Sequence, residues 1–170
     1  MELQEFLQLP QALGQWVQPE TRRAQGLERL RPLLRALQAG QVVEFEYYNY
    51  WEGAAETRTV GPLLLKEFRG RWYLLGQMAY GNSRHLACFG LDRIRGLRLI
   101  ERPFSPPAGF DATAYYAHAF GITRPSYGKL QQVLLRFGAA QGHYAPLYPL
   151  HASQRVVRAT DEEIDLTLTV

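Results

Sequence analysis

The hydrophobic pattern along the chain changes at Gly26. Residues 1–25 contain Pro10 and Pro19 and a mixed pattern, which predicts an irregular lead-in that could include a short helix. After it, leucines recur at helical spacing with arginines between them: Leu27, Leu30, Leu33, Leu34 and Leu37. This spacing predicts one helix over residues 26–39, and Gly40 follows it as a C-terminal cap would.

After Gly40 the chain alternates between apolar and polar positions, which is typical of half-buried strands. Further strands follow the first one and are joined by short turns, so the predicted set lies at residues 41–50, 57–65, 72–78, 85–89 and 92–100. Pro62 cannot donate a ladder hydrogen bond, so it is expected at an edge or a bulge. These closely spaced short strands predict a small five-stranded antiparallel barrel with a leading helix.

The carboxy-terminal part begins with a linker marked by Pro103, Pro106 and Pro107. Residues 110–120 then resemble a helix, because Asp111 lies near its start and Gly121 follows its end. Beyond it we expect a strand at 129–137, a short helix or turn at 142–150, and strands at 156–157 and 164–170. The last strand pattern runs to the final residue, which suggests that this second unit is incomplete.

The predicted fold class is therefore α+β and rich in strands. We expect four parts, namely a lead-in at 1–25, a barrel with its helix at 26–104, a linker helix at 105–128 and a second unit at 129–170. The composition agrees with folded domains, because 46% of the residues are hydrophobic and 21% are charged. The single cysteine, Cys88, cannot form an internal disulfide, which fits a reducing compartment, and we interpret it as a small buried apolar residue. With no signal peptide and no long apolar stretch, a cytoplasmic protein without a membrane partner is expected.

The net charge of +3 is unevenly distributed. Between Lys66 and Arg102 there are eight basic residues and three acidic ones, whereas the rest of the chain is slightly acidic. A local basic excess among aromatic residues indicates an anionic partner. The alternative is a solvated arginine-rich surface, and for any single arginine this is the better interpretation.

The sequence contains no recognisable catalytic motif and no recognisable metal-binding motif. No pair of histidines has the spacing of a metal-ligand set, and the four are His85, His118, His143 and His151. The chain has no glycine-rich phosphate loop and no nucleophile elbow, and the acidic run at 161–165 is typical of a solvated loop. We therefore predict a protein that is not an enzyme and that needs neither a metal nor a cofactor.

Arginine and aromatic side chains remain as candidates, and they lie on neighbouring strands of the predicted barrel: Tyr47, Arg58, Arg71, Trp72, Tyr73, Arg84 and Arg93. Guanidinium groups bind phosphate in a bidentate manner, and aromatic faces stack on bases. Together they would form a nucleotide-binding surface. The alternative for Trp72 or Tyr73 alone is core packing, because adjacent strand residues face opposite ways and one of them points inward.

Four short motifs occur in order, namely Val43-x-Phe45-x-Tyr47, Arg58-x-Val60-x-Pro62, Arg71-Trp72-Tyr73-Leu74 and Phe89-x-Leu91-Asp92-Arg93-Ile94. Over residues 26–104 they resemble the WYL domain, which is named after the Trp-Tyr-Leu tripeptide. Beyond it, Tyr115-Tyr116 and Phe120-Gly121-Ile122 resemble the connector of WYL regulators. Residues 133–154 resemble the start of their C-terminal extension, called WCX.

The resemblance implies an Sm-like barrel followed by part of a ferredoxin-like WCX unit, in a regulator that senses a ligand and forms a homodimer. The implied ligand is a nucleotide or a single-stranded nucleic acid. Relatives usually carry a helix-turn-helix in front of the barrel, but only about 25 residues precede the helix here. Duplex DNA binding is therefore expected only through a helix-turn-helix that this chain lacks.

Positions that match the family's motifs suggest a ligand patch of Tyr47, Arg58, Tyr73 and Arg93, with His85 or Arg84 as a fifth member. That fifth member would replace an arginine that the family often has where this chain has Ala87. The barrel core is assigned to the opposite face of the third strand, with Trp72, Leu74, Phe45 and Val60, and Asp92 is expected to orient a neighbouring arginine. The alternatives to a ligand sensor are an interaction or dimerisation module without a small ligand and a nuclease-like enzyme.

Overall fold

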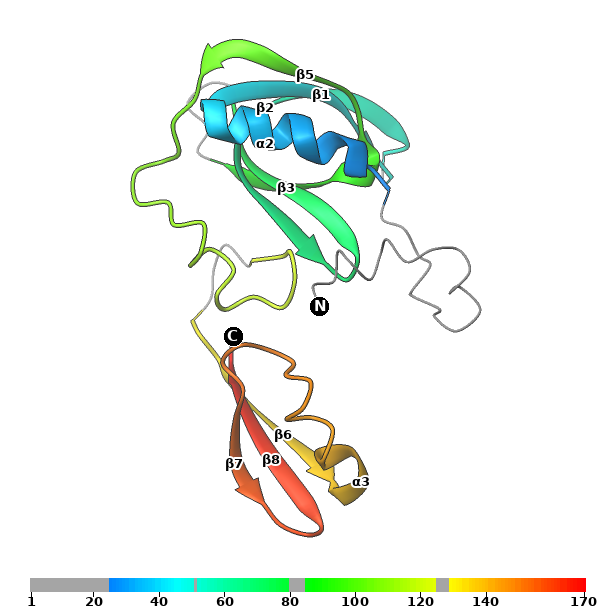
Figure 1. The fold of residues 1–170 in the computed structure, drawn as a ribbon, viewed down its shortest axis with the longest axis vertical. Helices are drawn as coiled ribbons and strands as arrows, with labels where there is room; N and C mark the ends of the chain where they lie inside the picture. The colour runs from blue at the N-terminus through cyan, green and yellow to red at the C-terminus, as the bar shows by residue number, and fades with distance from the viewer. Residues whose placement is uncertain (1–24, 51, 80–84, 125–128) are drawn as a thin grey trace, which may run out of the picture.

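The computed structural model describes residues 25–50, 52–79, 85–124 and 129–170. Strands dominate the structure, and they form one five-stranded sheet and one three-stranded sheet. Figure 1 shows the larger sheet curled beneath a short helix and the smaller sheet, yellow to red, apart from it in that view. The predicted fold class, α+β and rich in strands, is confirmed.

The leading helix consists of a 3-10 turn, η2 (Leu27–Arg29), and the α-helix α2 (Leu30–Ala39). Gly26 and Gly40 flank it, and both adopt left-handed backbone conformations that glycine tolerates best. Leu33 and Ala36 are fully buried where the helix packs against β1 and β2. The leucine spacing therefore predicted the position of the helix, but its buried face only in part, because Leu33 is buried whereas Leu27 and Leu34 are exposed.

The larger sheet is built from five antiparallel strands in the order β4-β3-β2-β1-β5. The strands are β1 (Gln41–Asn49), β2 (Ala54–Phe68), β3 (Arg71–Met78), β4 (Leu86–Gly90) and β5 (Ile94–Pro103), with a 3-10 turn η3 (Leu91–Arg93) between the last two. Hairpins join β1 to β4 in sequence, and η3 carries the chain across so that β5 pairs with β1. We call these strands with η3 and α2 the barrel.

Pro62 lies at the only irregularity between β2 and β3, where the register shifts between Pro62 and Leu64. The bulge expected from the proline is confirmed. β2 extends beyond the predicted 57–65 at both ends, because its hairpin partners continue the hydrogen-bond ladder.

The barrel core lies on the inner face of the curved sheet. Phe45, Val60 and Leu74 are fully buried there, and Trp72 packs against the same cluster. The assignment of these four residues to the core is confirmed. The ring of Phe45 meets that of Phe89 edge to face, with centroids 5.3 Å apart, so the cluster joins β1 to the edge strand β4.

The prediction of a helix at 110–120 is wrong, because this segment forms a series of turns. Asp111 still makes the hydrogen bonds expected of a capping residue, but to a turn, because its Oδ1 accepts hydrogen bonds from the backbone N–H groups of Thr113 and Ala114. The turns that follow are closed mainly by shorter bonds, such as that from Ala119 N–H to the Tyr116 carbonyl. The cause is tertiary, because the aromatic side chains of the segment pack onto the outer face of the barrel in a second cluster that contains Leu63, Leu75, Phe110, Tyr115 and Tyr116.

The second sheet contains β6 (Gln132–Gly138), β7 (Arg155–Ala159) and β8 (Glu163–Thr169) in the order β6-β8-β7. The strands expected at 129–137, 156–157 and 164–170 are therefore present. The short helix α3 (Ala139–Gly142) ends where the predicted 142–150 element was expected to begin, and turns follow it. Leu166 and Leu168 of the central strand are buried, so this sheet has a small core of its own.

One carboxylate is buried in the second sheet. Asp165 is 5% exposed and receives two hydrogen bonds from Arg136, from Nε to Oδ1 at 2.7 Å and from Nη2 to Oδ2 at 2.9 Å. These bonds hold the pKa of the Asp165 carboxyl below its ordinary value.

We expect this pair to make the second sheet acid-sensitive. A carboxyl whose pKa is lowered in the folded state stabilises the fold above its unfolded pKa, about 3.9, and loses that contribution as the pH falls through the lower folded pKa. A carbon-13 NMR titration should show the midpoint of Asp165 rise when Arg136→Gln removes the charged donor. Equal midpoints in the two proteins would contradict the role of Arg136.

Candidate ligand-binding site

The barrel has a pocket of about 350 Å³ at one end of its inner face. Nine residues line it, from β1, β2, β3, β4, η3 and the residue before β4: Tyr47, Asn49, Arg58, Met78, His85, Ala87, Cys88, Phe89 and Arg93. Among the described residues, the lining combines aromatic and cationic side chains and contains no carboxylate. The arrangement suits a ligand with a planar part and a negative charge.

Strand alternation explains why these side chains converge. Tyr47 follows the core residue Phe45 by two positions, so both point to the inner face. Arg58 pairs with Phe45 across β1 and β2 and therefore shares that face. The pocket begins where the apolar positions of the core give way to polar ones along the same face.

Arg93 and Tyr47 contact each other in the lining of the pocket. The Arg93 guanidinium lies 4.6 Å from the centroid of the Tyr47 ring, which is a cation–π arrangement. The Tyr47 hydroxyl accepts a hydrogen bond from the Gly90 N–H at 3.2 Å. Burial raises the pKa of this phenol, although the Gly90 N–H and the Arg93 charge act in the opposite direction. Tyr47 is therefore a neutral, fixed ring on which Arg93 rests.

The Nε atom of Arg93 is buried and has no hydrogen-bond partner among the described residues. A buried donor without a partner costs roughly 1–3 kcal/mol. Asp92 Oδ1, which is also buried and without a partner, lies in the same region, since a Cβ added at Gly90 would be 2.5 Å from that oxygen and 3.4 Å from this Nε.

Arg58 is half-buried and forms an ion pair with Glu56, two residues before it on β2. Its guanidinium is thus held at the pocket with part of its charge compensated. His85 also lines the pocket, whereas Arg84 lies outside the described residues. Of the predicted patch, the structure brings together Tyr47, Arg58, His85 and Arg93.

The family model for the WYL domain matches residues 28–99. These residues form a WYL domain. All of the pocket-lining residues lie within it, whereas the segment after β5 and the second sheet lie outside it.

Solved structures and curated proteins resemble the chain less clearly than the family model does. A solved structure of proteasome accessory factor B/C (PafBC) of Arthrobacter aurescens is similar to 91% of this chain, with a TM-score of 0.44 and 17% sequence identity. The chain spans 22% of that protein's length. No curated protein matches the chain.

Tyr73 of the WYL tripeptide lies outside the pocket. It is 6% exposed, and the Arg71 guanidinium lies 5.7 Å from its ring centroid. The strand divides as predicted, because Trp72 and Leu74 face the core and Tyr73 faces away from it. The pocket, however, opens on the inner face, where the core also lies. Tyr73 points to the outer face and therefore does not line the pocket.

Asp92 was expected to orient a neighbouring arginine, and in the WYL domain its partner is Arg71. The Arg71 Nη2 and the Asp92 Oδ2 lie 2.5 Å apart, which ties the start of β3 to η3. The second carboxylate oxygen, Oδ1, is buried and has no hydrogen-bond partner among the described residues. Asp92 therefore helps to fix the turn that carries Arg93.

Sequence reasoning did not assign five of the lining residues to the site: Asn49, Met78, Ala87, Cys88 and Phe89. Alternation could have placed Asn49 and Ala87, because they share the inner face with Tyr47 and Phe89. Cys88 fits its predicted role only in part, since it is half-buried and also lines the pocket. Burial raises the pKa of its thiol, and its Sγ accepts a hydrogen bond from the Tyr116 hydroxyl at 3.6 Å.

Among the described residues, no group of three or more His, Cys, Asp or Glu side chains is placed to hold a metal ion. The same part of the chain contains no helix that is long and apolar enough to cross a bilayer.

Proposed function

We propose that the WYL domain is the ligand-sensing part of a regulator and that its pocket binds an anionic nucleotide or a single-stranded nucleic acid. The observation that carries this proposal is the Arg93 guanidinium, which rests on the Tyr47 ring in a pocket that also contains Arg58. A phosphate group in the pocket would pair with the Arg93 guanidinium through charged hydrogen bonds. Arg58 would contribute a second cation to the same group.

The size and composition of the pocket support this ligand class. A volume of about 350 Å³ is at the lower end of the range for small-ligand sites and suits one nucleotide or the end of a strand. Tyr47 and Phe89 offer aromatic surface for a base. In this proposal the protein binds the ligand without transforming it, because the described lining residues include no carboxylate base and the raised pKa of Cys88 keeps its thiol protonated at neutral pH.

The rest of the chain has supporting roles in the proposal. Residues 105–128 connect the WYL domain to a unit at 129–170 that begins a WCX-like extension. The regulator acts in the cytoplasm as a homodimer, and it contacts duplex DNA only through a helix-turn-helix in an associated segment or protein.

Fluorescence anisotropy with a labelled single-stranded oligonucleotide, and with AMP as competitor, tests the proposal. We expect binding that weakens as salt rises from about 50 to 200 mM, because phosphate binding releases counterions. The variant Arg58→Ala/Arg93→Ala should lose about a hundredfold in affinity, which corresponds to one charged hydrogen bond from each arginine.

The matched control is Arg31→Ala/Arg95→Ala, which removes two exposed arginines that do not line the pocket. It lowers the net charge by the same amount and should change the affinity only slightly. Absence of binding at low salt would refute the ligand class, and equal losses in the two double variants would refute the site.

A further inference from the structure

A row of aromatic rings leads from the barrel core to the exposed turn after β1. Phe89 meets Tyr47 edge to face, with centroids 5.0 Å apart. The Arg93 guanidinium lies 4.6 Å from the centroid of the Tyr47 ring and 5.8 Å from that of the Tyr50 ring. Tyr47 lines the barrel pocket and Tyr50 does not, so Arg93 contacts one ring inside the pocket and one ring outside it.

Tyr50 is the exposed end of this row. It comes directly after Asn49, the last residue of β1, and lies in a turn, where strand alternation no longer fixes the side to which a residue points. Its ring meets that of Tyr48 edge to face, with centroids 5.2 Å apart. Although Tyr48 and Arg93 both contact it, Tyr50 is 70% exposed, which leaves most of the ring accessible to a ligand.

The order of these groups matches the order of groups along a nucleic-acid strand. A phosphodiester carries a nucleoside on each side, and the face of either base can stack on an aromatic ring. With the phosphate at Arg93, one nucleoside enters the pocket beside Tyr47 and the next lies outside it beside Tyr50. A mononucleotide has no second base and therefore gains nothing from Tyr50.

We propose that Tyr50 is a stacking platform for a second base, so that the site binds a single strand in preference to a mononucleotide. This inference rests on the proposed nucleotide-binding function and selects one of its two ligand classes. Stacking on an exposed ring tolerates any base, so this position recognises the presence of a second nucleotide and not its sequence.

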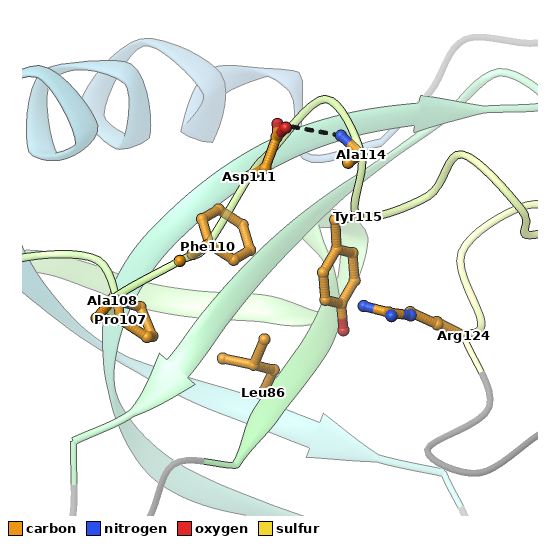
Figure 2. A pocket seen from close by; sticks show the side chains of 9 residues that line it. Leu86, Pro107, Ala108, Phe110, Asp111, Ala114, Tyr115 and Arg124 are labelled. Atoms are coloured by element: carbon orange, nitrogen blue, oxygen red, sulfur yellow. Dashed lines mark hydrogen bonds between the residues drawn. The ribbon is translucent and has the colours of Figure 1, made fainter.

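A second pocket, of about 370 Å³, lies on the other side of the edge strand β4 and provides a comparison within the same chain. Leu86 faces this second pocket, whereas Ala87 and Phe89 face the barrel pocket. Figure 2 shows a similar pair in its lining, in which the Arg124 guanidinium lies 5.1 Å from the centroid of the Tyr115 ring.

The Arg124 pair differs from the pair at Arg93 in two respects. Tyr115 is half-buried, because it packs against Phe110 and Tyr116 at centroid distances of 5.7 and 4.7 Å. The lining also contains Asp111, whose negative charge opposes a phosphate. Arg124 therefore serves as the control for an arginine that stacks on a tyrosine outside the proposed strand site.

Isothermal titration calorimetry on the full chain at low salt tests the proposal with AMP, the dinucleotide d(ApA) and the two d(ApA) analogues that each lack one base. The analogues keep the phosphodiester and remove one stacking group. We expect d(ApA) to bind about tenfold more tightly than either analogue, which is the factor expected for one base stacked on an aromatic side chain.

The variant Tyr50→Ala should weaken d(ApA) about tenfold and leave AMP unchanged, because AMP does not reach this ring. Tyr50→Phe keeps the ring and should bind d(ApA) as the unaltered protein does. Tyr144→Ala is the matched control, since Tyr144 is 69% exposed and lines neither pocket. Both tyrosines are exposed, so these variants should fold. Tyr144→Ala and Arg124→Gln should leave the affinity for both ligands unchanged.

The outcomes separate this inference from the proposed function. If neither AMP nor d(ApA) binds, the nucleotide-binding function is wrong and the inference falls with it. If the ligands bind but Tyr50→Ala behaves like Tyr144→Ala, only the stacking platform is refuted. Equal weakening of AMP and d(ApA) by Tyr50→Ala would also overturn the inference, because Tyr50 would then act by positioning Arg93.

Discussion

Replacing Leu74 with alanine is expected to lower the free energy of unfolding by about 3 kcal/mol. Leu74 is 0% exposed and belongs to the inner cluster of the barrel, between Leu65 of β2 and Phe89 of β4. The substitution removes buried methyl groups and leaves a cavity that a closely packed core fills only in part. Urea denaturation followed by circular dichroism measures the loss.

The matched control for this prediction is Leu134→Ala in β6, because Leu134 is 61% exposed. A surface substitution of this kind changes stability by roughly 0.5 kcal/mol or less. If the two variants lost similar amounts, Leu74 would not lie in the core, and the division of the Trp72-Tyr73-Leu74 strand would be incorrect.

The second large effect is expected at Gly26, which begins the leading helix. Gly26 has a φ of +82°, and an added Cβ would lie 2.5 Å from the Leu91 carbonyl oxygen and 2.8 Å from the Asp92 nitrogen. Gly26→Ala therefore combines an unfavourable backbone conformation with a clash against the backbone of η3, for a total of roughly 3 kcal/mol. Because η3 carries Arg93, the variant should also bind the oligonucleotide more weakly.

Gly53→Ala separates these two contributions. Gly53 also has a positive φ, +63°, but nothing lies within 4 Å of an added Cβ. It should cost only about 1 kcal/mol and leave ligand affinity unchanged. Chemical denaturation and the anisotropy titration give both quantities, and equal losses in the two variants would show that contact with η3 is unimportant.

The edge strand β4 contributes side chains to both pockets. Its inner side contributes Ala87 and Phe89 to the barrel pocket, and its outer side contributes Leu86 to the second pocket. Cys88 touches both regions, since it lines the barrel pocket and accepts the hydrogen bond from Tyr116. A short strand thus separates the candidate ligand site from the segment that leads to the second sheet.

Local patterns in the sequence predicted most of the barrel. Helical leucine spacing gave α2, and strand alternation gave five strands with Phe45 and Leu74 facing inward. Such patterns succeed because residues two apart on a strand, or three to four apart on a helix, share a face whatever surrounds them. The motif resemblance located the WYL domain, and it named Tyr47, Arg58 and Arg93, which the structure places around one pocket.

Tertiary packing determined the conformation of residues 110–120 and the position of the pocket. Residues 110–120 have a helical pattern, yet they form turns because Phe110, Tyr115 and Tyr116 are drawn onto the outer face of the barrel. Alternation showed that Tyr73 faces away from the core, but only the curvature of the sheet determined that the pocket opens on the other face. The sequence by itself determined which residues share a face, because that depends on local backbone geometry. Which faces meet and where a cavity remains depended on contacts between segments far apart in the chain, which no local pattern records.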